Sequence, residues 1–217
     1  MIITRQKDKK TILDYLREDK KIFIAGCAQC ATVCKTGGEE EVLSMKNFLQ
    51  KHGKKITGTC IVDPPCHLVK TKKMYQQYKK QIQESDSILA MACGDGIQTI
   101  MDGAKDKKVH PALDTLFLGE IQPNGRFAQK CSLCSECVLE ETGGLCPITL
   151  CPKGLLNGPC GGAKNGKCEV DKEMDCVWIQ IYERLKKLNQ LPKMKKIYPA
   201  RDNSIRLHPR KIILERK

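Results

Sequence analysis

Between residues 9 and 120 the chain alternates between short apolar runs and amphipathic stretches. The apolar runs predict strands, and they lie at 21–26, 55–62, 87–92 and 115–119. The amphipathic stretches predict helices, and they lie at 9–18, 38–51, 67–83 and in a shorter segment that ends near 104. Strands that alternate with helices in this way predict an α/β domain with a doubly wound parallel sheet.

Between residues 121 and 177 this alternation ends, because glycine and proline interrupt every candidate helix or strand. An amphipathic helix is expected to follow at 177–188, with an apolar stripe made of Trp178, Ile181, Tyr182, Leu185 and Leu188. We therefore expect a small Rossmann-like α/β domain at 1–122. An irregular cysteine-rich domain closed by that helix should occupy 123–188, and an extended basic tail 189–217.

The chain contains 14 cysteines, and their spacing is its strongest chemical signal. A triplet, Cys27-x2-Cys30-x3-Cys34, follows the first predicted strand, and eight more lie between Cys131 and Cys176. Such spacing lets one loop wrap several thiolates around a metal or cluster. Because 217 residues can bury a core without disulfides, and no secretory signal or apolar run of 18 residues is present, we expect a cytoplasmic protein without a membrane span.

The eight later cysteines can form two sites of four thiolates each. They are Cys131, Cys134, Cys137, Cys146, Cys151, Cys160, Cys168 and Cys176. The first three match the first three ligands of a bacterial ferredoxin motif, but eight residues rather than three precede the fourth cysteine. The pattern predicts two 4Fe-4S clusters, or one cluster and zinc, because thiolates suit both. Spacing does not decide which cysteines share a site.

The N-terminal triplet needs a fourth ligand to complete a cluster. In open α/β sheets, sites form beyond the carboxyl ends of the strands. Cys93 follows the 87–92 strand as directly as Cys27 follows its own, so Cys93 is the first choice and Cys66 the close competitor. Cys60 is expected to be a buried strand thiol. The glycines nearby match neither GxGxxG nor the P-loop, which disfavours nucleotide binding.

The charge of the chain changes this picture little. The formal net charge is +13, and residues 183–217 hold twelve Lys or Arg against three acids. A solvated or partner-docking tail explains this better than nucleic-acid binding, and four Phe, five Tyr and one Trp leave few stacking platforms. We expect no nucleic-acid partner and keep a basic zinc module for nucleic acid as a remote alternative.

Catalytic motifs are absent from the sequence. It holds no catalytic triad, HExxH motif or P-loop, and its four histidines are scattered. The isolated chain is therefore expected to be an accessory protein without catalytic residues of its own.

Two sets of motifs resemble those of a known family. The later set is Glu141-Thr142-Gly143-Gly144-Leu145-Cys146-Pro147, Asn157-Gly158-Pro159-Cys160-Gly161-Gly162, Gly166-Lys167-Cys168-Glu169-Val170 and Cys176-Val177-Trp178. The earlier set is Cys27-x2-Cys30-Ala31-Thr32-Val33-Cys34-Lys35-Thr36-Gly37-Gly38-Glu39 and Ala92-Cys93-Gly94-Asp95-Gly96-Ile97-Gln98-Thr99. Together they cover most of residues 20–185 and resemble the MetV-type accessory subunits of methylenetetrahydrofolate reductase in acetogenic bacteria.

This resemblance implies an iron–sulfur electron-transfer subunit of a methylenetetrahydrofolate reductase complex in the Wood–Ljungdahl pathway of one-carbon metabolism. Such subunits pair with a MetF-like flavin subunit, and the FMN belongs to that partner only. Electrons would come from ferredoxin or another redox module. Two or three 4Fe-4S clusters are implied, one in the N-terminal region and one or two in the C-terminal region. The alternative is a zinc-stabilised scaffold of the same complex that transfers no electrons.

Overall fold

The computed structural model describes residues 1–104 and 106–213, so residues 214–217 of the expected basic tail lie outside the described residues. The chain divides into two compact units, Met1–Phe127 and Ala128–Lys217. Each unit has its own hydrophobic core. None of the helices in the described ranges is both long enough and apolar enough to cross a bilayer.

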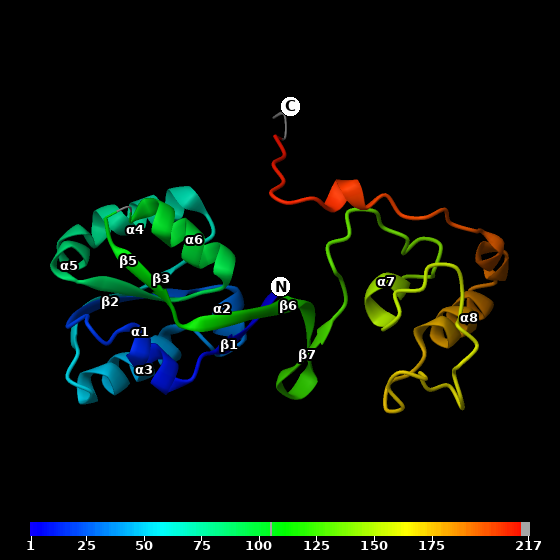
Figure 1. Cartoon of the computed structure of the whole chain (residues 1–217), viewed down its shortest axis with the longest axis horizontal. Helices are drawn as coiled ribbons and strands as arrows, with labels where there is room; N and C mark the ends of the chain where they lie inside the picture. Colours follow the sequence, from blue (N-terminus) through cyan, green and yellow to red (C-terminus); the bar gives the residue numbers. More distant parts are fainter. Residues whose placement is uncertain (105, 214–217) are drawn as a thin grey trace. The chain divides into compact units, whose positions relative to one another are not determined.

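Unit 1 is built on a four-stranded parallel sheet (Figure 1). Its strands lie in the order β3 (Lys55–Val62), β2 (Lys21–Cys27), β4 (Ser87–Met91) and β5 (Lys108–Pro111). The chain runs outward from β2 to β3 and then returns past β2 to form β4. The direction of winding therefore reverses between β2 and β4, and this reversal is where open α/β sheets form their binding sites.

Helices cover both faces of this sheet, which confirms the predicted doubly wound α/β architecture (Figure 1). One face carries α1 (Lys9–Tyr15), α2 (Cys30–Val33) and α3 (Glu39–Lys51), and the other carries α4 (Leu68–Gln77), α5 (Lys79–Glu84) and α6 (Gly94–Gly103). Side chains alternate along β2 accordingly. Ile22 and Ile24 enter the first core, while Phe23 and Ala25 enter the second.

A second, antiparallel sheet was not expected from the sequence. It contains β1 (Ile2–Gln6), β6 (Leu113–Gln122) and β7 (Arg126–Gln129) in the order β1-β6-β7, and the 3-10 turn η1 (Pro123–Gly125) precedes β7. The prediction that residues 115–119 close the parallel sheet is therefore wrong, because they pair antiparallel with β1. The fourth parallel strand is β5, whose sequence Lys-Val-His-Pro lacks an apolar run. An edge strand tolerates such polar residues and proline.

The turn that carries the first cysteines is held against the end of β4. The Cys27 N–H donates to the Gly37 carbonyl at 2.9 Å. A Cβ atom on Gly37 would lie 2.1 Å from the Met91 carbonyl oxygen, so only glycine permits this approach. The Glu41 carboxylate then accepts from the Gly38 N–H at 2.9 Å and starts α3. Residues 27–38 therefore form a compact loop at the carboxyl end of the sheet.

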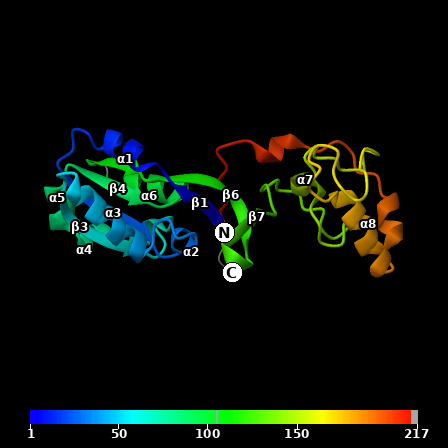
Figure 2. The same cartoon turned by 90° about the horizontal axis from the view of Figure 1, so that it is seen from below.

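Unit 2 contains little regular structure (Figure 2). Its helices are α7 (Pro147–Leu150) and α8 (Val177–Lys187), with 3-10 turns η2 (Leu191–Lys195) and η3 (Asn203–Arg206) beyond them. The core forms on α8, where Trp178, Ile181 and Leu185 are buried as the sequence predicted. Tyr182 and Leu188, which were expected on the same apolar stripe, are exposed instead. Trp178 also donates its indole N–H to the Leu155 carbonyl at 3.2 Å. One helix therefore organises a segment made mostly of loops.

Candidate metal centres

Two cysteines from distant parts of the chain meet at the reversal of the parallel sheet. Cys27 is the last residue of β2, and Cys93 directly precedes α6 just beyond β4. Both are buried. The pairing of Gly26 with Met91 sets the two strand ends side by side. This location agrees with the expectation that Cys93 lies near the N-terminal cysteines.

Two further thiols join this pair. Cys30 begins α2, and Cys66 precedes α4. Burial raises the pKa of the Cys66 thiol, and the Asp95 carboxylate and the thiols of Cys93 and Cys27 raise that pKa further. We call Cys27, Cys30, Cys66 and Cys93 the N-terminal group.

Burial and neighbouring groups also shift the pKa of the Cys27 thiol. Burial raises its pKa, and repulsion from Cys30 and Cys93 adds to that effect, while backbone N–H groups of Ala31 and Gln29 oppose it. The Gln29 N–H lies 3.4 Å from the Cys27 Sγ. Cys27 and Cys66 therefore favour the neutral thiol, and a bound cation would have to displace protons from them.

The remaining cysteines of unit 1 lie outside this group. The Cys34 Sγ lies 3.8 Å from the Ile2 carbonyl oxygen on β1, which it faces as a donor. Cys60 is buried in β3 against the second core, as expected, and burial raises its pKa to about 12. The structure therefore places both sequence candidates for a fourth ligand, Cys66 and Cys93, near Cys27, and it directs Cys34 toward β1.

In unit 2 the first four cysteines surround one cavity. Cys131, Cys134, Cys137 and Cys146 line a space of about 400 Å³. We call them the first C-terminal group. Their loop turns sharply, because Leu133 and Ser135 adopt left-handed backbone conformations with φ of 55° and 69°. This turn lets the Leu133 N–H approach the Cys131 Sγ at 3.4 Å, a donor of the kind that stabilises metal-bound thiolates.

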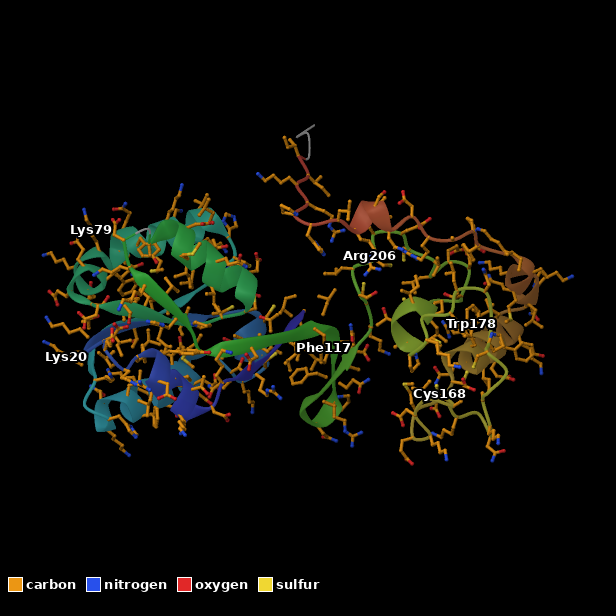
Figure 3. All side chains as sticks on the ribbon, in the orientation of Figure 1. Lys20, Lys79, Phe117, Cys168, Trp178 and Arg206 are labelled. Atoms are coloured by element: carbon orange, nitrogen blue, oxygen red, sulfur yellow. The ribbon has the colours of Figure 1, made fainter. Side chains whose placement is uncertain are left out.

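The last four cysteines surround a separate, much smaller cavity. Cys151, Cys160, Cys168 and Cys176 line a space of about 20 Å³, and we call them the second C-terminal group. Cys168 and Trp178, both labelled in Figure 3, line this space. Two backbone hydrogen bonds of 2.8 Å, from the Cys168 N–H to Met174 and from the Cys176 N–H to Gly166, hold the hairpin that carries two of the thiols.

The thiols of these groups do not yet converge on a single point. Within residues 1–104 and 106–213, no three His, Cys, Asp or Glu side chains lie close enough together to hold one metal ion as they stand. Ligands must approach a zinc ion or cluster iron to about 2.3 Å. Binding at any of the three groups would therefore require the thiols to rotate inward.

The sequence did not indicate which basic residues approach the thiols. Arg210 lines the cavity of the first C-terminal group, and Arg201 donates to the Cys134 carbonyl at 3.0 Å. Both come from the basic tail. Its composition was the only sequence signal for them, and composition does not show where a tail folds.

Part of the chain matches the model of a known protein family. Residues 110–204 match the family described as methylene-tetrahydrofolate reductase C terminal. This segment contains all eight cysteines of unit 2 and relates that part of the chain to methylenetetrahydrofolate reductase. Neither the curated proteins nor the solved structures compared with the chain gave a match.

Proposed function

We propose that this chain is the iron–sulfur subunit of a methylenetetrahydrofolate reductase complex and passes electrons to the FMN of a MetF-like catalytic subunit. The observation that carries the proposal is the division of eight cysteines into two groups of four around two separate cavities. These cysteines lie in the segment that matches the reductase family. Four thiolates are the usual ligand set of a 4Fe-4S cluster.

The first C-terminal group suits a cluster by size. Its cavity of about 400 Å³ exceeds what a single ion needs, since about 10–15 Å³ on the same measure already holds one water molecule. Cys131 and Cys137 are exposed at its mouth, and Cys134 is buried. These residues would hold the cluster partly shielded from water and near the surface, where a partner can exchange electrons with it.

The second C-terminal group suits a more compact centre. Its cavity of about 20 Å³ has the size of one small ligand, which favours zinc at this site unless the loops move apart. The apolar side chains of Leu155 and Trp178 line it. Here the thiols would tie the loops of unit 2 to α8.

The N-terminal group would form the third centre. Cys27, Cys30, Cys66 and Cys93 supply four thiols at the carboxyl end of the parallel sheet, beside Asp95. With two or three 4Fe-4S clusters bound, the chain would carry one electron at a time from ferredoxin or another redox module to the flavin, which collects two. The folate chemistry would belong to the MetF-like partner of the Wood–Ljungdahl pathway.

A second candidate is a zinc-stabilised scaffold of the same complex. The small cavity of the second C-terminal group favours it, because a single ion at each thiolate group would hold the loops without carrying electrons. Both candidate functions require the cysteines as metal ligands. The identity of the bound metal, iron or zinc, distinguishes the two functions.

The test is the content of iron, zinc and acid-labile sulfide in protein purified anaerobically with the neighbouring reductase subunit, together with EPR of the dithionite-reduced sample. The proposal predicts about eight to twelve irons per chain with matching sulfide and reduced-cluster signals. The double variant C131S/C134S should lose about four irons. C60S is the matched control and should lose none, because Cys60 belongs to none of the three groups. Zinc without iron would overturn electron transfer and support the scaffold.

A further inference from the structure

The C-terminal arm, residues 189–213, folds back onto the cysteine-rich loops of its own unit (Figures 1 and 2). We propose that this arm is a cationic strap over the first C-terminal group, in which Arg201 holds the cysteine loop and Arg210 supplies positive charge to the metal–thiolate centre. The charge role rests on the proposed function. The strap itself rests on the contacts of the arm.

Two lysines at the start of the arm form ion pairs with glutamates of the cysteine-rich domain. The Lys193 ammonium donates to the Glu140 carbonyl at 2.9 Å and to its carboxylate at 2.7 Å. The Lys196 ammonium donates to the Glu141 carboxylate at 2.7 Å. These ion pairs hold the arm along the loop between Cys137 and Cys146, which belong to the first C-terminal group.

A paired hydrogen bond fixes the middle of the arm. The Asn157 amide donates to the Tyr198 carbonyl at 2.8 Å, and its carbonyl oxygen accepts from the Tyr198 N–H at 2.8 Å. A side-chain amide that satisfies both backbone groups of one residue holds the arm in one register. Asn157 lies between Cys151 and Cys160, so this contact joins the arm to the second C-terminal group as well.

Arg201 forms hydrogen bonds with the cysteine loop of the first C-terminal group. Its Nη2 donates to the carbonyls of Cys134 at 3.0 Å and Glu136 at 3.3 Å. The side chain is only 14% exposed, and its Nε is buried without a hydrogen-bond partner among the described residues. The Glu136 carboxylate lies 3.9 Å from Nη2, and a thiolate centre next to this loop would add further negative charge near the guanidinium.

Arg210 reaches the cavity directly. It lines the space among the four cysteines and donates through Nη1 to the Ser135 hydroxyl. A 4Fe-4S cluster with four thiolates carries about two negative charges, while Glu136 on the cavity wall adds another. Arginine stays charged at every physiological pH, so Arg210 provides a fixed counter-charge.

The positive charge of Arg210 should affect the reduction potential of the cluster. Each reduction adds one electron, supplied by the donor of the proposed complex, and makes the centre more negative by one charge. A positive group at the cavity wall stabilises that reduced state more than the oxidised state and therefore raises the reduction potential. Removing the positive charge of Arg210 should therefore lower the reduction potential of the cluster.

Arg206 provides a matched control. It lies on the same arm in η3, is labelled in Figure 3, and is exposed. None of the hydrogen bonds or ion pairs described for residues 1–104 and 106–213 involves its side chain. R206Q therefore removes one charge from the arm without removing a contact to the cysteine loop.

The experiment compares R201Q/R210Q, R210Q, R210K and R206Q in the intact complex. Hydrogen exchange of residues 131–139 should become about tenfold faster in R201Q/R210Q and stay unchanged in R206Q. This readout applies whether the bound metal is iron or zinc, so equal exchange in the two variants overturns the strap even if the proposed function stands.

The proposed role of the Arg210 charge is tested by measuring the reduction potential of the cluster, with EPR recorded during a redox titration. R210Q should shift the ratio of oxidised to reduced cluster about tenfold toward the oxidised state at a given potential, and R210K should restore the ratio. R206Q should leave it unchanged. Equal shifts in R210Q and R206Q would overturn the charge role. Protein that contains no iron would overturn both the proposed function and this role, while the exchange data would still decide the strap.

Discussion

Cys27 and Cys93 stand side by side beyond the carboxyl ends of two neighbouring parallel strands, and the Cys93 thiol adds to the effect of burial in raising the pKa of Cys27. The pair lies where the winding of the sheet reverses. Their proximity follows from the parallel pairing of β2 with β4, because parallel strands bring their carboxyl ends to one edge.

The first prediction concerns the fourth ligand of this group. C93S should remove the N-terminal centre, which is about four irons or one zinc per chain. C34S should retain it, because the Cys34 Sγ faces the Ile2 carbonyl. Metal analysis of the two variants beside the native chain measures the difference. Loss of metal in C34S with full content in C66S would restore the triplet of the sequence motif as the ligand set.

Metal binding at the N-terminal group should strengthen as pH rises. Burial and neighbouring charges raise the thiol pKa of Cys27 and Cys66 above the ordinary value, so these thiols keep their protons at neutral pH. Each proton that binding releases makes the affinity rise by about tenfold per pH unit below that pKa. Zinc competition titrations at several pH values, with C93S as the reference, measure this slope. A slope no steeper than that of C93S would contradict the prediction.

Removal of metal should unfold unit 2 and leave unit 1 folded. Unit 2 has one core helix and long loops, so we predict that bound metal supplies much of its stability, whereas unit 1 has two apolar cores around a sheet. After treatment with a strong chelator, amides in 128–213 should lose protection from hydrogen exchange, and those of β2 and β4 should keep it. Retained protection around α8 would show that the loops hold together without metal.

Asp19 should stabilise unit 1 through a buried carboxylate. It is 3% exposed and accepts hydrogen bonds from Lys108 at 3.1 Å and His110 at 3.0 Å. Burial alone would raise its pKa, but the neighbouring side chains of Ser87, Lys108 and His110 outweigh burial and lower it. D19N should lower the free energy of unfolding by about 1–3 kcal/mol.

The pH dependence of this effect has a definite sign. Since the folded pKa of Asp19 is depressed, its contribution is present above the ordinary carboxyl pKa and is lost as pH falls through the folded value. Urea unfolding of D19N and the native chain should therefore converge in acid. D14N is the control, since the exposed Asp14–Arg17 pair contributes about 0–0.5 kcal/mol. An equal loss in D14N would contradict the buried role of Asp19.

The sheet of unit 1 shows which elements a sequence can predict. β2 and β4 are buried on both faces, so they appear as continuous apolar runs between glycine and polar residues. β5 and β1 carry no such run. They were missed because edge pairing tolerates polar side chains, and their partners β4 and β6 come from other parts of the chain.

The sequence by itself determined which ligand atoms are available, because the number and close spacing of the thiols predict metal or cluster sites of four thiolates. Only the tertiary structure decided how the thiols are grouped. Cys66 approaches Cys93 because the sheet brings two strand ends together, and the cysteines of unit 2 divide at Cys146 and Cys151 because their loops enclose two cavities. The arm that delivers Arg210 has no periodic pattern. Its position depends on hydrogen bonds to residues far away in the chain, and local spacing carries no signal for such contacts.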